Sequence, residues 1–196
     1  MSKLIETHPF PAILPANATV MMMGSFPPKD EKRCMQFHYP NFQNDMWRIY
    51  GMVFFGDVEY FQIKGEKRFD PERIKAFLYE KGIALCPTVR KAIREKDNAA
   101  DKFLTIVEAV DLAKVLPLVP NCRWLFTTGG KATEILLDLL PEKIKSPKTN
   151  EYIVYPYPNS TLYLYRLPST SRAYPLGFMK KVEAYRTFFS KAGLIE

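Results

Sequence analysis

The sequence predicts an α/β fold in which short parallel strands form a sheet that helices cover on both faces. Apolar runs at residues 19–23, 83–86, 123–127 and 162–167 each end close to a glycine or a proline. Stretches with apolar residues at helical spacing lie between these runs. Apolar strands that alternate with helices are typical of a buried parallel sheet. With 196 residues, 47% of them hydrophobic, the chain is expected to form one domain over residues 1–196.

The first half of the chain also predicts an extended N-terminal segment and two helices. Three prolines between positions 9 and 15 indicate an extended N-terminal segment over residues 1–18, ahead of the first strand. Apolar residues at helical spacing predict a helix over residues 45–55, with Asn44 or Asp45 as its N-cap. Pro71 is placed as the first-turn proline of a second helix, which ends before the next glycine.

The second half predicts three further helices and an edge strand. Residues 90–101 are charged and are expected on the surface, and residues 106–116 have the pattern of a helix. Another helix is expected over residues 131–140, after two glycines. A polar, proline-rich connection includes a short edge strand at residues 152–155, and a helix over residues 177–192 closes the fold.

The composition indicates a polyanion as partner and a reducing compartment. Lysine and arginine exceed aspartate and glutamate by seven, and the pI is about 9.2, which favours a nucleic acid as partner. Cys34, Cys86 and Cys122 lie far apart and form no CxxC pair. The chain contains no signal-peptide pattern and no run of 18 apolar residues. We therefore expect a cytoplasmic protein.

Four loops follow the predicted strands, and each combines turn-forming residues with hydroxyl or cationic side chains. In open parallel sheets, ligands bind beyond the carboxyl ends of the strands. Backbone amides, hydroxyls and cations together suit contacts with phosphate. The same residue types are also what a turn at a strand end needs. The four loops are residues 24–28, 87–90, 128–131 and 168–172.

Five segments together resemble the uracil-DNA glycosylase superfamily, most closely its hypoxanthine-DNA glycosylase branch. They are MMMGSFPP, QNDMWRIYG, GIALCPTV, FTTGGKAT and RLPSTSRAY, in the family's order, within residues 20–174. The resemblance implies a three-layer α/β/α fold with a central four-stranded parallel sheet and no metal or organic cofactor. It also implies a monomeric DNA repair enzyme that hydrolyses the N-glycosidic bond of a deaminated base, uracil or hypoxanthine, after the nucleotide is flipped out.

The resemblance assigns roles to the first two segments. Asn44 would position the attacking water or the base, although it equally fits a helix cap. Asp45, beside it, could act as a general base, and it too could be only a cap. Ser25 is the third catalytic candidate, and it would line the base pocket together with Phe26. Either Phe26 or Phe42 would stack on the flipped base.

The last segment would contact the DNA. Ser169, Thr170 and Ser171 would bind the phosphates that flank the extruded nucleotide, although these residues are also typical of a turn after a strand. Arg172 or Tyr174 would enter the gap that the nucleotide leaves in the duplex.

Some positions depart from the family pattern. Pro87 stands where the family often has a residue that reads the base, and its side chain has no donor or acceptor. Gln43 or Asn41 could supply hydrogen bonds to the base edge instead. Leu167 replaces the histidine that opens the last motif in commoner members. Lys131, after two glycines, would bind a phosphate or remain a solvent-exposed lysine.

Two alternatives to a glycosylase remain open. The chain could be a glycosylase-like module that binds DNA or a nucleotide without cleaving it, or a small-molecule enzyme that uses the same cleft. Cys34 and His38 lie four residues apart but lack further zinc ligands or an orienting partner. The sequence contains neither GxGxxG nor GxxxxGK[ST], which are the motifs typical of dinucleotide-binding and P-loop nucleotide-binding proteins.

Overall fold

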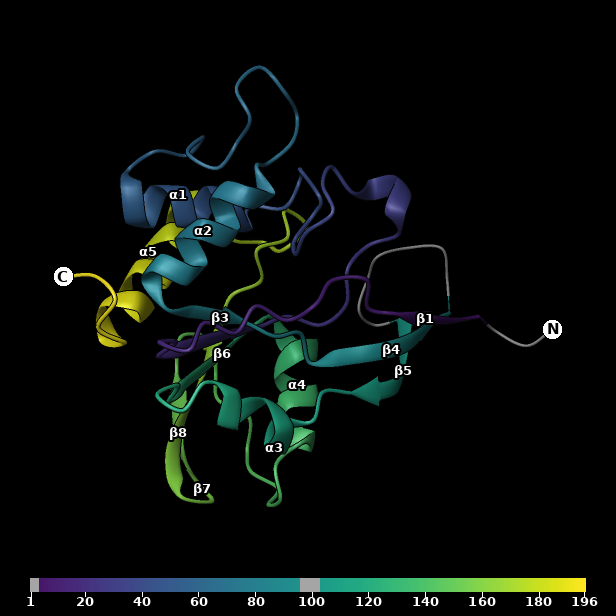
Figure 1. Ribbon diagram of the computed structural model, residues 1–196, viewed down its shortest axis with the longest axis vertical. Coiled ribbons are helices and arrows are strands. Elements are labelled where there is room, and N and C mark those ends of the chain that lie inside the picture. The colour runs from purple at the N-terminus through teal and green to yellow at the C-terminus, as the bar shows by residue number, and fades with distance from the viewer. Residues whose placement is uncertain (1–3, 96–102) are drawn as a thin grey trace.

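The computed structural model describes residues 4–95 and 103–196, and a five-stranded sheet lies at its centre (Figure 1). The strands of this sheet are β2 (Val20–Met23), β3 (Ile83–Leu85), β6 (Trp124–Thr128), β7 (Tyr152–Tyr157) and β8 (Ser160–Leu167). Their order is β3-β2-β6-β8-β7. The first four are parallel, which confirms the predicted four-stranded parallel sheet. β7 pairs antiparallel with β8 and forms the edge.

Helices cover both faces of this sheet. One face carries α1 (Met46–Phe55), α2 (Pro71–Lys81) and α5 (Phe178–Lys191), and the other carries α3 (Leu112–Val115) and α4 (Gly130–Asp138) (Figure 1). Each face has its own cluster of buried side chains, and successive methionines of β2 point to opposite clusters. This is the three-layer α/β/α arrangement that the sequence predicts.

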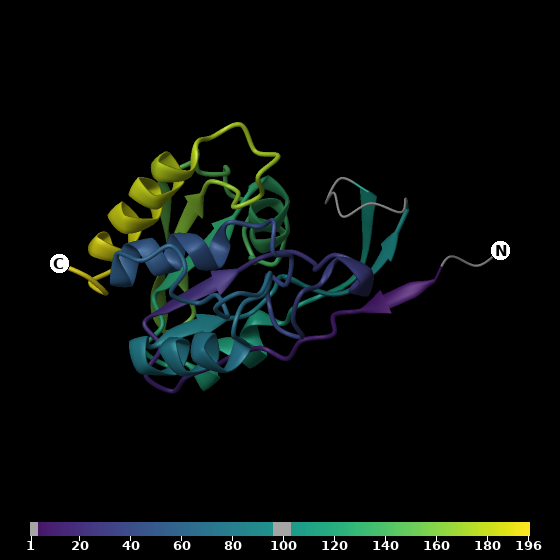
Figure 2. The same ribbon diagram turned by 90° about the horizontal axis from the view of Figure 1, so that it is seen from above.

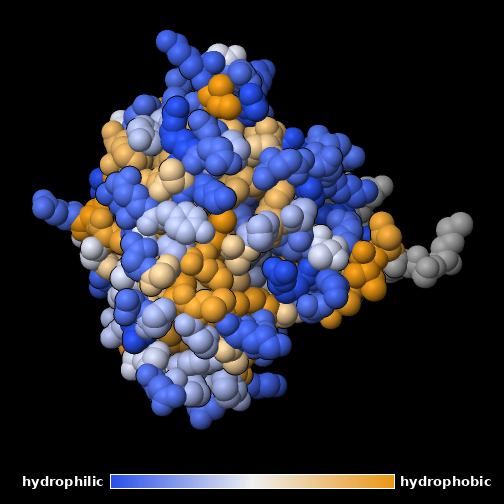
Figure 3. Space-filling view, viewed as in Figure 1, coloured by the Kyte–Doolittle hydropathy of each residue, from blue (hydrophilic) through white to orange (hydrophobic). Residues whose placement is uncertain are grey.

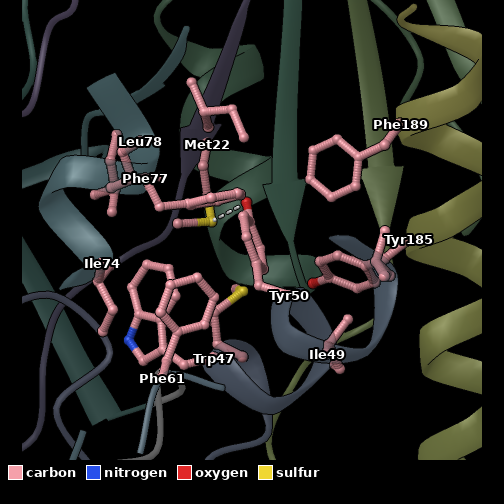
Figure 4. Close-up of a cluster of buried hydrophobic side chains, with 14 of the residues drawn as sticks. Met22, Trp47, Ile49, Tyr50, Phe61, Ile74, Phe77, Leu78, Tyr185 and Phe189 are labelled. Carbon is pink, nitrogen blue, oxygen red and sulfur yellow. Dashed lines mark hydrogen bonds between the residues drawn. The ribbon is translucent and has the colours of Figure 1, made fainter. Parts of the chain in front are cut away.

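Aromatic residues fill the layer between the sheet and helices α1, α2 and α5 (Figure 4). Trp47 and Tyr50 of α1 are fully buried, and their rings pack edge to face. The Tyr50 hydroxyl donates to the sulfur of Met22 at 3.2 Å, and the Trp47 indole N–H donates to the His38 carbonyl at 3.0 Å. The start of α1 is thus fixed against the carboxyl end of β2.

A second, three-stranded antiparallel sheet lies beside the main body (Figure 2). It consists of β1 (Ile5–Thr7), β4 (Val89–Arg94) and β5 (Leu104–Ala109), in the order β1-β4-β5. The predicted helix over residues 106–116 is therefore wrong at residues 106–109, which belong to β5, and within the predicted range only α3 is an α-helix. The run of Thr, Ile and Val at positions 105–107 favours a strand, and the helix α3 is short.

The other sequence predictions of helices and strands agree with the structure to within a few residues. The N-terminal segment is mostly extended, but part of it forms β1. The first six residues of the charged stretch 90–101 belong to β4 and the bend after it, and the rest lies outside the described residues. Asp70 caps α2 by accepting two backbone N–H bonds, and Gly82 ends that helix with a φ of +65°. Two short 3-10 helices, Asp30–Lys32 and Leu116–Leu118, complete the described elements.

The face of the molecule in Figure 3 is largely hydrophilic. On the face in Figure 3, apolar side chains gather in a band across the middle, and hydrophilic side chains surround it. Within residues 4–95 and 103–196, no helix combines the length and the apolar character needed to cross a membrane.

Candidate functional site

A pocket of about 220 Å³ opens at the carboxyl ends of the parallel strands. Residues from all four predicted strand-end loops line it: Gly24 to Pro28 after β2, Pro87 after β3, Thr128 after β6, and Ser169 to Ser171 after β8. The parallel strands bring these segments together because their carboxyl ends share one edge of the sheet. We call this cavity the strand-end pocket.

The segment between β1 and β2 and the loop before α1 close the other side of the strand-end pocket. The N-terminal segment contributes His8 and Phe10, and the loop before α1 contributes residues 38–41 and Asn44. The histidines and Tyr39 were not among the residues that the sequence singled out as site candidates. Their positions depend on the path of two irregular segments, for which a single sequence carries little signal.

Asn44 lies in the strand-end pocket and also caps the following helix. Its side-chain oxygen accepts the backbone N–H of Met46 at 2.9 Å. The N-cap residue of α1 is Asp45, whose side chain makes no capping hydrogen bond. In the described part of the chain, no hydrogen bond occupies the Nδ2 group of Asn44. The capping bond therefore fixes the amide while leaving two donors for a bound molecule.

Tyr39 is fixed across the pocket by a hydrogen bond to Thr128, with 2.8 Å between the two hydroxyl oxygens. Its backbone has a φ of +51°, an uncommon value for a residue with a side chain. A Cβ at Gly24 would lie 2.5 Å from the Tyr39 hydroxyl. A glycine at position 24 therefore permits the close approach of this ring to the end of β2.

Two buried histidines form part of the pocket wall. The rings of His8 and His38 lie 5.5 Å apart, and the His38 Nε2–H donates to the Pro11 carbonyl at 2.7 Å. Burial lowers the pKa of His8 to about 3, with a further contribution from His38. Burial likewise lowers the pKa of His38 to about 4. Both imidazoles are therefore neutral at physiological pH.

The carboxylate of Asp45 lies outside the strand-end pocket, in a buried ion-pair network. Its oxygens accept from Arg172 Nε at 3.0 Å and from Lys181 Nζ at 3.1 Å. Lys181, with 1% of its side chain exposed, also donates to the Ser171 carbonyl at 2.8 Å. The backbone N–H of Asp45 donates to the Thr170 carbonyl at 3.0 Å. Asp45 thus joins the start of α1 to the loop after β8.

The hydroxyls of that loop also bond locally. Ser169 Oγ accepts the N–H of Ser171, and Ser171 Oγ accepts the N–H of Ala173, both at 3.2 Å. Thr170 is buried, whereas Ser169 and Ser171 are half-buried. These hydroxyls can stabilise the turn and still bind a phosphate, because a hydroxyl that accepts one hydrogen bond can donate another.

Other predicted site residues lie in or near the pocket wall. Phe26 and Pro87 line the strand-end pocket, as does Ser25. Phe26 packs edge to face against His8, and the guanidinium of Arg94 lies 5.9 Å from the centre of its ring.

Asp45, Arg172 and Tyr174 do not line the strand-end pocket, and neither do three further predicted residues. Phe42 packs on Phe69 and carries the Arg48 guanidinium 4.3 Å above its ring. Gln43 accepts from Arg172 at 2.8 Å. Lys131, at the start of α4, pairs with Glu134 at 3.2 Å.

The described residues provide no metal site. No group of three or more histidine, cysteine, aspartate or glutamate side chains lies close enough to hold an ion within residues 4–95 and 103–196. Cys86 and Cys122 are buried with raised pKa values of about 11 and 12, because burial disfavours their thiolates.

Comparison with known proteins supports the same fold. No protein-family model and no curated protein sequence matches the chain. Among solved structures, the chain is similar to the solution NMR structure of a candidate uracil DNA glycosylase from Methanosarcina acetivorans. The TM-score is 0.65 at 22% identity, and the match covers 97% of this chain and 99% of that one. The chain therefore has a uracil-DNA glycosylase-like α/β/α fold.

Proposed function

We propose that this protein is a monofunctional DNA glycosylase, which hydrolyses the N-glycosidic bond of a flipped deaminated base such as uracil or hypoxanthine. The observation that carries this proposal is the strand-end pocket, in which Asn44 faces the hydroxyl-rich loop after β8 in a uracil-DNA glycosylase-like fold. A glycosylase must bind an extruded base in a closed pocket and hold the flanking backbone at its rim. The strand-end pocket provides a cavity for the base, and the hydroxyl-rich loop after β8 lines it.

The size and polarity of the pocket suit a neutral base. Its volume of about 220 Å³ is smaller than the ~300–1,000 Å³ of drug-sized ligand sites. Among the described residues that line it, none carries a carboxylate or a lysine or arginine cation, and both histidines are neutral. A positively charged alkylated base would find no counter-charge there, whereas uracil and hypoxanthine need only hydrogen bonds. We infer that the substrate base is uncharged.

Asn44 is the proposed catalytic residue. An amide can orient a water molecule but cannot remove its proton at neutral pH. The N-glycosidic bond would therefore break first, with its electron pair leaving on the base. The water that Asn44 orients would then attack the sugar cation and pass its proton to the departed base or to solvent. No lysine lies among the pocket residues to form a Schiff base with the sugar. The reaction would accordingly stop at the abasic site.

One observation favours a second candidate, a module that binds DNA without cleaving it. The carboxylate nearest Asn44, that of Asp45, is engaged by Lys181 and Arg172 and does not line the pocket. Of the described residues that line the pocket, His8 and His38 could accept a proton, but their lowered pKa values make them weak bases, and the Pro87 side chain offers no donor to the leaving base. Salt-sensitive DNA binding without turnover would fit this candidate.

A base-release panel tests the proposal. Purified protein is incubated with labelled oligonucleotides that carry uracil, hypoxanthine or xanthine, single-stranded and in each mismatch. Alkaline cleavage then reveals abasic sites. Release of at least one base supports the glycosylase. No release from any oligonucleotide, with DNA binding intact, would leave the binding module.

Two variants separate catalysis by Asn44 from its capping role. Asn44→Ser retains a side-chain oxygen for the Met46 N–H but removes the amide, whereas Asn44→Ala removes both. We expect base release to be lost in both variants, and stability to fall mainly in Asn44→Ala. Full activity in Asn44→Ser would assign Asn44 to capping alone.

A further inference from the structure

A second hollow lies on the other side of the segment that carries Asn44. It has a volume of about 450 Å³. Its walls come from the start of α1, the loop after β8, the start of α5 and the loop after α1. We call it the arginine groove, and its lining residues are Asp45, Arg48, Val58, Arg172, Leu176, Phe178 and Lys181.

The arginine groove carries excess positive charge. Three cationic side chains line it against one carboxylate, a difference of two. Asp45 and Lys181 are both buried and neutralise each other at 3.1 Å. Arg48 and Arg172 supply the excess, and Arg172 is about half exposed. Burial lowers the pKa of Arg48, and the charge of Arg172 contributes in the same direction.

Both guanidiniums are held in place with donors to spare. Arg48 Nη1 donates to the Phe42 carbonyl at 2.7 Å and to the Asn44 carbonyl at 3.2 Å. Arg172 donates from Nε to Asp45 and from Nη1 to Gln43. Within the described residues, the Nη2 group of each arginine makes no hydrogen bond. Two fixed guanidiniums with free N–H groups are suited to bind an oxyanion such as a phosphate.

The arginine groove and the strand-end pocket share a rim. Asn44 lines the pocket while Asp45 lines the groove, and Ser171 lines the pocket while Arg172 lines the groove. Consecutive Cα atoms are about 3.8 Å apart. The groove and the pocket therefore lie next to each other along both segments.

We propose that the arginine groove binds a phosphodiester group of the same DNA strand, next to the nucleotide in the strand-end pocket. This inference rests on the proposed DNA substrate but not on base release. Arg48 and Arg172 would contact the phosphate oxygens. Asp45 orients Arg172, and Lys181 keeps the charge of Asp45 from cancelling that of the arginines.

The salt dependence of DNA binding tests this site. Arg48→Met removes the charge but keeps an apolar side chain over Phe42. Arg123→Met is the matched control, because Arg123 also donates to two backbone carbonyls but lies at the amino end of β6. Loss of one phosphate contact on duplex DNA lowers the slope of log affinity against log salt by about 0.9. The wild type would thus lose about 3.5-fold more affinity than Arg48→Met over a fourfold rise in salt. We expect an unchanged slope in Arg123→Met and in Arg48→Lys.

Methylphosphonate substitution locates the phosphate. Each phosphate that flanks the modified nucleotide is replaced in turn by this uncharged analogue. We expect one position to weaken binding of the wild type, with no further loss in Arg48→Met. Additive losses, or equal slopes in Arg48→Met and Arg123→Met, would overturn the proposal.

Two further measurements distinguish the possible failures. If inorganic phosphate raises the unfolding temperature of the wild type but no methylphosphonate position is sensitive, the groove binds free phosphate and the DNA assignment is wrong. The base-release panel is run on the same preparations. If one methylphosphonate position weakens binding but no base is released, the phosphate site in the arginine groove is supported and the glycosylase proposal is refuted. If a base is released but no position weakens binding, the glycosylase proposal is supported and the phosphate site is refuted.

Discussion

The two buried histidines of the strand-end pocket make stability depend on pH. The pKa values of His8 and His38 are lowered from 6.5 to about 3 and about 4 in the folded protein. Between pH 6.5 and 4, the unfolded chain therefore binds more protons than the folded chain, and stability falls as pH falls. At pH 5, each histidine has lost about 2 kcal/mol of its contribution relative to pH 7.

We therefore expect the free energy of unfolding to fall by about 4 kcal/mol between pH 7 and pH 5 from these two groups together. Urea unfolding at pH 7, 6 and 5 measures this loss. The window lies above the ordinary pKa values of carboxyl groups, about 3.9 to 4.3, so these contribute little.

Two variants assign the effect to the histidines. His8→Asn keeps a polar atom near the Nδ1 position that meets the Phe10 backbone, and His38→Gln keeps a donor for the Pro11 carbonyl. Each variant should reduce the loss between pH 7 and pH 5 by about 2 kcal/mol, whatever its stability at pH 7. A loss that is equal in wild type and variants, or stability that rises toward pH 5, would refute this reasoning.

Two further predictions concern the residues that hold the pocket in shape. Asp45→Asn leaves the Lys181 ammonium buried without its carboxylate, which should cost about 3–5 kcal/mol of stability in urea unfolding. Asp111→Asn is the control, because Asp111 is an exposed residue that caps a short helix and asparagine can also cap. An equal loss of stability in the two variants would show that the ion pairs of Asp45 do not stabilise the fold. Tyr39→Phe removes the hydroxyl bond to Thr128 and should cost about 1 kcal/mol. It should also weaken binding to a modified oligonucleotide, and unchanged stability and binding would show that this bond does not shape the pocket.

The sheet and the helices around it are predictable from sequence because their signals are local. The strand at Val20–Met23 is entirely apolar and ends at a glycine, and α2 begins at Pro71 behind a capping aspartate. The second sheet is not predictable in this way. β5 has an apolar spacing that also fits a helix. Its partner β4 lies on the far side of the connection that contains residues 96–102, so no local pattern marks the pairing.

The candidate site is predictable only in part. The four strand-end loops converge because parallel strands share one carboxyl edge, so the sequence places Ser25, Pro87 and the loop at 169–171 together. Asn44 and Asp45 are neighbours in sequence, yet their side chains face different cavities. The ion pair between Asp45 and Lys181 joins residues 136 positions apart. No local pattern marks such a contact.

The central claim is that the strand-end pocket receives a base. Amide NMR spectra of the protein are compared in two DNA complexes, one with and one without that base. One oligonucleotide carries 2′-fluoro-deoxyuridine or its hypoxanthine counterpart, in which the fluorine slows bond cleavage, and the other carries a tetrahydrofuran abasic analogue. We expect the spectra to differ at residues 24–28, 38–41 and 169–171. Spectra that do not differ between the base-containing and the abasic complex, or differences confined to other regions, would contradict the account.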